Sequence, residues 1–336
     1  MSKLIFTADI HLQPFSNDTI ELENGIRLKL QELLNSIRQL LDYAVKNEIE
    51  TVIFGGDIGH HRSTIHTRPF YLFISLLMEY KDKITYKFIP GNHDGHPQFL
   101  GENCVSLLSG YENIDVFMEP TVEGNITYIP DGTDMYNDIK NAKGTDILVS
   151  HFPLSEAATD SGLKVTTKFS KKDLKKFKLV LIGDYHTHQT IDGFIHYPGT
   201  LIPMNKGEKG AKGFIVFDDE TLETEFVEVT GFRKYVEIEI TEETSAKELK
   251  SIIKESTESN DFLTVRNTLQ SIPTSLKSVV KDVTVIDDYE PEEIMRGISS
   301  AMQIGEQMKK FLEIEGINED EREKYLQIGL TALGCA

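Results

Sequence analysis

Polar residues that can bind metal ions or move protons recur at the ends of short apolar runs in this sequence. The segment "GNHDGHPQF" (91–99) is the densest of them, and it directly follows the apolar run "TYKFIP". In chain order the five clusters are "DIH" (Asp9, His11), "GGD" (Asp57, with His60 and His61 just after), "GNHD" (Asn92, His93, Asp94), "SHFP" (His151) and "GDYHTH" (Asp184, His186, His188). A single histidine at such a place is more often a hydrogen-bonded structural residue, but clusters that repeat in one structural position favour a shared site.

The mixture of carboxylate, amide and imidazole groups indicates divalent metal ions such as Mn²⁺, because closed structural zinc sites usually take cysteine and histidine ligands. The chain has only two cysteines, Cys104 and Cys335. This number excludes a cysteine-based metal site and argues against a disulfide framework. Asp57 has two carboxylate oxygens and can bridge two ions. Two ions about 3.5 to 4 Å apart can activate a water molecule and stabilise both oxygens of a phosphoester displacement.

Within "GNHD" the residue types predict different roles. Asn92 supplies a neutral ligand, which leaves His93 to act on the leaving oxygen or on the phosphate. We expect Asp94 to orient His93 by accepting a hydrogen bond from its ring N–H, as carboxylates behind functional histidines do.

The elements that position these clusters alternate between β-branched runs and amphipathic helices. Each cluster lies at the carboxyl end of a predicted strand, where open α/β sheets bind their ligands. The alternation is typical of a layered α/β fold. Strands are predicted over 3–9, 51–57, 85–94, 146–152, 178–186 and 213–218, and helices over 25–49 and 68–81.

The pattern changes at about residue 232. Short strands around the helical segment "SAKELKSIIKES" predict a small separate α+β unit, and residues 291–333 read as two helices. Pro291 suits a first helical position, Gly316 a helix end, and Asn318 with Glu321 the start of the second helix. We therefore expect three parts, at 1–231, 232–289 and 290–336.

The composition is that of an ordinary globular protein, with 336 residues and a net charge of −19 that opposes nonspecific attraction to nucleic acid. No signal-peptide pattern or long apolar run is present, so we expect a cytoplasmic protein without a membrane segment. The lysine-rich run 164–178 is an exception to the acidic character; a solvated helix face is the favoured interpretation, and a phosphate-binding patch the alternative. The segment "KGEKGAK" (206–212) reads as a flexible basic loop that is commonly a solvated turn, with contact to a phosphate backbone as the alternative.

These motifs resemble the calcineurin-like metallophosphoesterase superfamily, and within it the SbcD-type nucleases, above all those of phages. The resemblance implies an α/β fold with a β-sandwich flanked by helices, a small α+β capping domain and a C-terminal helix pair. It gives the first metal ion Asp9, His11, Asp57 and a residue of the last motif. It gives the second ion Asp57, Asn92, His151 and another residue of the last motif. His93 is then the catalytic histidine, and His60 a second group at the scissile phosphate.

The last motif departs from the family's usual "GHxH", because this chain has "GDYHTH". An ungapped match places Asp184 and His186 at the two ligand positions, and a shifted match places His186 and His188 there. We favour the ungapped match, since aspartate is a competent ligand and Gly183 keeps its turn position.

Further segments resemble the nucleases more than other phosphoesterases. The segment "HYPGTLIPMNKGEKGAKGFIVFD" (196–218) is similar to the one that follows their last metal motif. The C-terminal helix pair resembles the segment that binds the coiled-coil base of an ATPase subunit; closure onto its own domain is the alternative. Its apolar positions recur at helical spacing, at Ile294, Ile298, Met302, Met308, Phe311, Leu312, Tyr325, Leu326, Leu330 and Leu333.

The resemblance therefore implies a two-metal, Mn²⁺-dependent DNA exonuclease and endonuclease subunit, with Mg²⁺ as the alternative ion. Its implied partners are DNA, an SbcC-type coiled-coil ATPase and a second copy of itself in a homodimer, in DNA repair and recombination. One alternative is a stand-alone phosphatase or cyclic-nucleotide phosphodiesterase, which would not need the region after 232. Another is a metal-binding scaffold subunit with degenerate catalysis.

Overall fold

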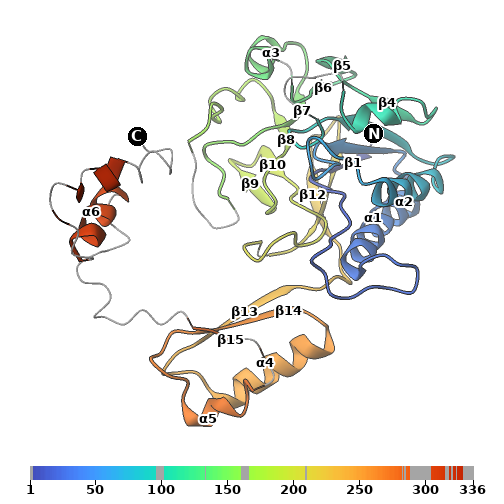
Figure 1. Ribbon diagram of the computed structural model, residues 1–336. Helices are drawn as coiled ribbons and strands as arrows, with labels where there is room; N and C mark the ends of the chain where they lie inside the picture. The colour runs from blue at the N-terminus through green and yellow to red at the C-terminus, as the bar shows by residue number, and fades with distance from the viewer. Residues whose placement is uncertain are drawn as a thin grey trace. The chain divides into compact units, whose positions relative to one another are not determined.

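A computed structural model of the chain divides into two compact units, Met1–Tyr235 and Val236–Ala336. Each unit is described by itself (Figure 1). The structure describes residues 3–95, 102–132, 134–159, 166–208, 210–281, 283, 285–287, 304–314, 318, 321–322 and 324–327.

Two six-stranded sheets form the first unit. One sheet has the order β12-β11-β1-β2-β3-β4, and the other has the order β5-β6-β7-β8-β10-β9. The strands of the first sheet are β1 (Lys3–Thr7), β2 (Thr51–Gly55), β3 (Thr85–Ile89), β4 (Ile114–Val116), β11 (Gly213–Asp218) and β12 (Thr224–Glu228). The strands of the second are β5 (Thr121–Glu123), β6 (Ile126–Ile129), β7 (Ile147–His151), β8 (Leu179–Gly183), β9 (Gln189–Ile191) and β10 (Ile195–Tyr197).

The sheets pack face to face because alternate side chains of each strand point to opposite faces. In β2, Ile53 belongs to the apolar cluster between the sheets, whereas Val52 and Phe54 belong to the cluster on the outer face. In β7, Val149 lies between the sheets and Leu148 on the other face. Both faces of each central strand are therefore buried, which explains the continuous apolar runs of the sequence.

Helices complete the layers. The helices α1 (Leu28–Lys46) and α2 (Thr67–Met78) pack against each other and contribute to the apolar cluster on the outer face of the first sheet, and Figure 1 shows them together there. The short helix α3 (Met135–Asn141) contributes Met135 and Ile139 to the cluster of the second sheet. A 3₁₀ turn, η1 (Val105–Leu108), follows β3. This architecture confirms the predicted β-sandwich flanked by helices.

The strands that carry the polar clusters run parallel within each sheet. In the first sheet β1 pairs with β2, and β2 with β3, in parallel. In the second sheet β7 pairs with β8 in parallel, with His151 opposite Gly183. Parallel strands end at the same edge of a sheet, so the polar groups that follow them are brought close together.

The second unit holds a three-stranded sheet with the order β13-β14-β15. Its elements are β13 (Tyr235–Ile240), α4 (Ala246–Glu258), β14 (Phe262–Asn267), α5 (Thr274–Lys277) and β15 (Val285–Asp287), followed by α6 (Ile304–Ile314). A small apolar core, including Ile240, Leu249 and Val265, joins α4 to the sheet. This arrangement agrees with the expected α+β character, while the three-part division of the chain stays a prediction.

The C-terminal region is described only in part. The backbone N–H of Glu321 donates to Asn318 Oδ1 at 3.0 Å, and the Asn318 amide donates to the Glu321 carboxylate at 2.8 Å, which confirms the predicted capping pair. Ile294, Ile298, Met302, Leu330 and Leu333, which the sequence assigns to the helix pair, lie outside the described residues. Among the described helices, none is long and apolar enough to cross a membrane.

Candidate active site

Three of the predicted metal ligands lie where the chain leaves β1 and β2, in backbone conformations that are rare for residues with a side chain. Asp9, His11 and Asp57 have φ angles of 56°, 48° and 54°, in the left-handed region. All three are buried, with at most 2% of their surface exposed. Strained backbone of this kind concentrates at functional sites, where the surrounding fold holds it in place.

The first donor group joins the two sheets. Side-chain donor atoms of Asp9, His11 and His186 all lie within 4.8 Å of one another. His11 Nε2 is 3.0 Å from His186 Nε2. Two ring nitrogens bound at about 2.1 Å to one ion would be separated by roughly 3 Å, so this spacing fits a shared metal ion.

The second donor group is built around Asp57. Donor atoms of Asp9, Asp57 and His151 also lie within 4.8 Å of one another. Asp57 Oδ2 is 3.4 Å from His151 Nε2 and 3.7 Å from His11 Nε2, so this carboxylate stands between the two groups. His151 is held from behind, because its Nδ1 donates to the Gly55 carbonyl at 2.8 Å and its Nε2 therefore faces Asp57.

Asn92 completes the second group. One end of its side-chain amide lies 3.2 Å from His151 Nε2 and 3.3 Å from each Asp57 oxygen, and the other end lies 3.2 Å from Arg62 Nη2. With its nitrogen toward Asp57 the amide donates to the carboxylate. Turned over, it brings its oxygen to the same place, as a neutral metal ligand requires.

Gly91 allows the "GNHD" loop to approach Asp57. A Cβ atom at Gly91 would lie 2.4 Å from Asp57 Oδ1. The absence of a side chain there lets the backbone N–H of His93 donate to the same oxygen at 2.7 Å.

The pKa shifts reflect acids and imidazoles that face one another in a buried site. Burial, with repulsion from Asp57, raises the pKa of Asp9 to about 7 although His151 opposes it. Burial would also raise the pKa of Asp57, but the charge of His151 and a hydrogen bond from it hold that pKa well below its usual range. Burial lowers the pKa of His11 to about 3, against the attraction of Asp57. Oxygen and nitrogen donors gathered in this way fit divalent cations.

A donor atom of His93 lies within 4.8 Å of those of His11 and Asp57, and the His60 ring stands beside them. His93 Nδ1 bonds to the His60 carbonyl oxygen at 2.8 Å, which leaves the other ring nitrogen of His93 for proton transfer. The His60 ring is 5.3 Å from that of His11 and 6.1 Å from that of His93, between ring centroids. Burial, and then the charge of His61, lowers the pKa of His60 to about 4, so at neutral pH His60 is neutral and can offer a hydrogen bond.

The expected contact of Asp94 with the His93 ring is wrong. The Asp94 carboxylate instead accepts from the backbone N–H groups of Gly91 and Gly59, both at 2.7 Å, and from Cys104 Sγ at 3.2 Å. Asp94 thus ties together the loops that follow β2 and β3. Burial and repulsion from Asp57 raise its pKa to about 6. Its role is to hold the loops, because a backbone carbonyl already fixes the His93 ring.

In the last motif, the structure brings His186 into the first donor group, whereas the role of Asp184 as a ligand stays a prediction. His186 joins Asp9 and His11, and the backbone N–H of Asp184 donates to both Asp9 oxygens at 3.1 and 3.2 Å. Burial and repulsion from Asp57 raise the pKa of Asp184, against the attraction of His151. His188 lies elsewhere: its ring stacks on Phe226 at 3.8 Å between centroids, and its Nδ1 donates to the Tyr197 carbonyl. The geometry therefore does not support His188 as a ligand.

Two basic segments differ from their predictions. Residues 171–176 form turns rather than a helix, and within the run Lys171 pairs with Asp192 and Lys178 with Asp146. In "KGEKGAK", Glu208 and Lys212 are 5% and 2% exposed and form an ion pair of 2.6 Å, so two of its charges are buried although Lys206, Gly210 and Ala211 are exposed. Glu208 and Lys212 are four residues apart in the sequence, but their burial and the aspartate partners of Lys171 and Lys178 depend on packing.

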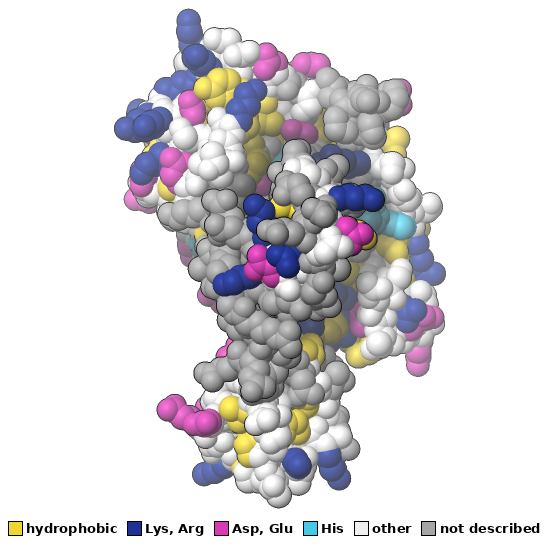
Figure 2. All heavy atoms as spheres, turned by 60° about the vertical axis from the view of Figure 1, so that its left-hand side comes forward, with side chains coloured by type: hydrophobic (Ala, Val, Ile, Leu, Met, Phe, Trp, Pro, Cys, Tyr) yellow, Lys and Arg dark blue, Asp and Glu magenta, His cyan; other side chains and the backbone are white. Residues whose placement is uncertain are grey.

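Sequence reasoning also missed Arg62. Its guanidinium lies at the Asn92 amide and its side chain is exposed. Figure 2 shows histidine side chains reaching the molecular surface, with dark blue Lys or Arg side chains beside them. A hint was present in the sequence, because Arg62 directly follows His60 and His61.

The fold and the donor groups fit one class of protein, a phosphoesterase with candidate metal ligands at the strand ends of two packed sheets. The sequence matches the family described as calcineurin-like phosphoesterase over residues 2–188, which is more than half of the chain. The chain belongs to this family of metallophosphoesterase enzymes.

Comparison with individual proteins identifies a nuclease relative. The chain is 29% identical over 238 residues to "Exonuclease subunit 1" of Enterobacteria phage T4, and the match covers 67% of each protein. Among solved structures it is similar to a dimetal phosphatase from Danio rerio, with 11% identity, a TM-score of 0.39, and coverage of 64% of this chain and 91% of that one. It is also similar to the protein TT1561 of Thermus thermophilus, with 12% identity, a TM-score of 0.37, and coverage of 68% and 98%.

Proposed function

We propose that this protein is a two-metal, Mn²⁺-dependent DNA phosphodiesterase with exonuclease and endonuclease activity. One observation carries the two-metal part: Asp57 Oδ2 stands 3.7 Å from His11 Nε2 and 3.4 Å from His151 Nε2, between two groups of donors. The similarity to a phage exonuclease subunit supports DNA as the substrate.

The proposal assigns each donor group one ion. Asp9, His11 and His186 would hold the first ion, and Asn92 and His151 the second, with Asp184 as the further ligand that the ungapped match implies; Asp57 would serve both ions. Bound there, the ions supply a lowered pKa for an attacking water molecule and positive charge for the phosphate oxygens.

The side chains around the ions carry the remaining steps. His93, fixed at Nδ1 by the His60 carbonyl, donates a proton from Nε2 to the departing sugar oxygen. His60 donates a hydrogen bond to a nonbridging phosphate oxygen, and the exposed Arg62 binds the phosphate at the edge of the site.

The partners belong to the same proposal. The phage relative is named as a subunit, which supports a complex, and we propose a coiled-coil ATPase of SbcC type together with a homodimer in the cytoplasm, acting in DNA repair and recombination. Phe311 and Tyr325, on the helical segments after residue 304, are 54% and 44% exposed. Large exposed aromatic groups of this kind suit a docking face for a partner helix.

The test is nucleotide release from linear double-stranded DNA by the purified chain with Mn²⁺, beside its His93→Ala variant. A small chromogenic phosphodiester is assayed in parallel. We expect DNA degradation that the variant loses. Turnover of the small ester, with DNA left intact even when an ATPase partner is added, would instead favour a stand-alone phosphoesterase.

A further inference from the structure

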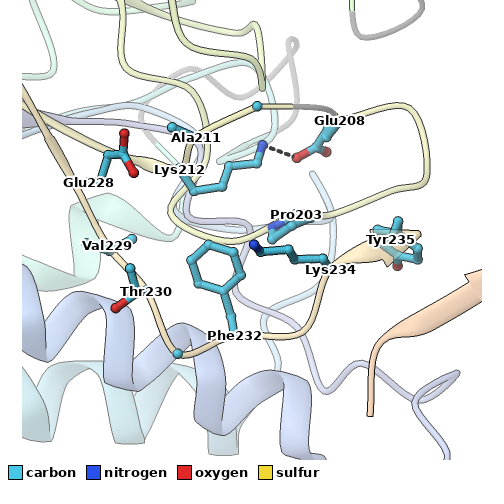
Figure 3. Close-up of a pocket in the computed structure, with 12 residues that line it drawn as sticks. Pro203, Glu208, Ala211, Lys212, Glu228, Val229, Thr230, Phe232, Lys234 and Tyr235 are labelled. Carbon is cyan, nitrogen blue, oxygen red and sulfur yellow. Dashed lines mark hydrogen bonds and ion pairs between the residues drawn. The ribbon is translucent and has the colours of Figure 1, made fainter. Parts of the chain in front are cut away.

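Glu208 is a buried carboxylate that no predicted role uses. It lies 22 residues after His186, and its side chain is fully buried. Its partner Lys212 is equally enclosed, with 1% of its side chain exposed. Figure 3 shows the two side chains pointing toward each other on the wall of a pocket of about 580 Å³. Burying an ion pair costs desolvation free energy, so we looked for a specific role of this pair.

The Glu208 carboxylate is fixed on every side. Oε2 accepts from Lys212 Nζ at 2.6 Å, from Thr200 Oγ1 at 2.9 Å and from the Met204 backbone N–H at 3.0 Å. Oε1 accepts from the Asn205 amide at 2.9 Å and lies 2.9 Å from His186 Nδ1. Hydrogen bonds to both oxygens leave the carboxylate one orientation, which faces the His186 ring.

The same pair holds the His186 backbone. Lys212 Nζ donates to the His186 carbonyl at 2.9 Å, and the Thr200 backbone N–H donates to it at 3.1 Å. Gly199 permits this approach, because its φ is +73° and a Cβ atom there would lie 2.6 Å from the His186 carbonyl oxygen. Ring and main chain of His186 are therefore positioned by one buried network.

This geometry fixes the tautomer of the ring. An ionised carboxylate accepts only, so His186 Nδ1 must carry the proton that Glu208 receives as a hydrogen bond. The lone pair then lies on Nε2, the nitrogen that is 3.0 Å from His11 Nε2. A metal ion requires that lone pair.

We infer that Glu208, held by Lys212, is a positioning residue that directs the Nε2 lone pair of His186 to the first metal ion. The inference rests on the proposed metal centre and adds a residue to it. Removing a carboxylate behind a metal-binding histidine typically lowers metal affinity by about 10- to 100-fold, and we expect a loss of this size here.

The first test needs no variant at this position. The metal-free full-length chain is labelled with ¹⁵N-histidine, and His186 is assigned by comparison with His186→Gln. We expect the ¹⁵N shifts of the tautomer with hydrogen on Nδ1. The opposite tautomer would overturn the inference, whether or not the protein cleaves DNA.

The second test compares Glu208→Gln with Glu32→Gln, by calorimetric Mn²⁺ titration and by the absorption spectrum of the Co²⁺-loaded chain. Glu32 is a matched control, because it is also a buried carboxylate paired with a cation, Arg233 Nε at 2.8 Å. A glutamine at 208 can donate to His186 Nδ1 and so moves the proton to Nε2.

The two variants distinguish a positioning role of Glu208 from a purely structural one. We expect Glu208→Gln to weaken one Mn²⁺ site by about 10- to 100-fold and to change the Co²⁺ spectrum, while Glu32→Gln leaves both as in the wild type. Unchanged Mn²⁺ affinity in folded Glu208→Gln, or an equal loss in Glu32→Gln, would overturn the positioning role. Both results are independent of the DNA assay, which tests the proposed function alone.

Discussion

Two buried charge clusters of the first unit can be compared directly. In one, Arg233 Nη1 and Nη2 donate to both oxygens of Asp18 at 3.0 and 2.7 Å, and Arg233 Nε donates to Glu32 at 2.8 Å. The other is the strand-end cluster, where His11 Nε2 faces His186 Nε2 at 3.0 Å and His11 Nδ1 has no hydrogen-bond partner among the described residues. The first cluster pairs donors with acceptors, whereas the second, besides its contacts to Asp57, brings two imidazole nitrogens face to face.

The difference distinguishes a structural charge cluster from a ligand site. Paired buried charges meet their own hydrogen-bonding needs and hold loops in place, as Arg233 does for the segment before β13. Two facing imidazole nitrogens can share a proton in a hydrogen bond, but when both keep their lone pairs they need a cation between them, and a divalent ion fits that place. Variants in the two clusters should therefore affect different properties.

The largest effect is expected for His93→Ala. The loss of proton donation to the leaving oxygen should lower kcat on DNA by about 10²- to 10⁴-fold. His93 is not an assigned ligand, so the Mn²⁺ affinity should stay within about twofold of the wild type, a free-energy difference of roughly 0.4 kcal/mol. Steady-state kinetics and calorimetry measure the two quantities. A matching loss of Mn²⁺ binding would make His93 a ligand instead.

In the cluster of Arg233 with Asp18 and Glu32, the substitution Arg233→Met should lower the stability of the fold without changing metal affinity. It leaves Asp18 and Glu32 buried without their cation, which should lower the free energy of unfolding by about 3 to 5 kcal/mol. Urea unfolding of the metal-free chain measures the loss. Mn²⁺ affinity, measured well below the unfolding transition, should not change; if it falls with stability, the clusters are not separate.

Asp9→Asn, in the strand-end cluster, should change the pH dependence of stability in the metal-free chain. Because burial raises the pKa of Asp9 to about 7, the native state retains a proton that the unfolded state releases above its ordinary pKa of 3.8. The stability contributed by that proton is complete below pH 3.8 and is lost as pH rises through about 7. Urea unfolding with a chelator should therefore show wild-type stability falling relative to the variant between about pH 4.5 and about pH 7.5.

Added Mn²⁺ provides the control for this prediction. It should stabilise the wild type more than Asp9→Asn, because only the wild type has the complete first donor group. Parallel stability curves for the two proteins across this pH range would contradict the assignment of Asp9.

The sequence predicted the placement of the residues at strand ends correctly, but not that of residues whose contacts depend on the path of loops and turns. Asp9, Asp57, Asn92 and His151 could be predicted because each lies at the end of an apolar strand or within three residues after it. The parallel pairing of the strands then brings these strand ends together. Glu208 could not, because its meeting with His186 depends on the path of the loop after β10. The turns at 171–176 were mistaken for a helix, since a lysine-rich run gives no apolar period to separate the two.

Arg62→Ala should give a smaller effect at the edge of the site. Loss of a charged phosphate contact should raise KM for DNA about tenfold, or roughly 1.4 kcal/mol, with little change in kcat. Arg62→Lys keeps the charge and should recover part of the loss. An unchanged KM in Arg62→Ala would remove this residue from the substrate contacts.

The smallest effect is expected for the double variant Lys171→Gln, Lys178→Gln. Both lysines already pair with aspartates, at 2.8 and 3.1 Å, so they should not contact DNA. The dependence of DNA affinity on salt should keep its slope, whereas each lost phosphate contact would reduce that slope by about 0.9. A reduction of that size would restore the phosphate-binding interpretation of this run.

The number of Mn²⁺ ions bound per chain tests the central claim most directly. Equilibrium dialysis of the full-length protein, with metal analysis, should find two ions in the wild type. Asp57→Asn should bind both more weakly, because Asp57 stands between the two donor groups. A single ion per wild-type chain at saturation would contradict the two-metal site and favour a scaffold subunit with degenerate catalysis.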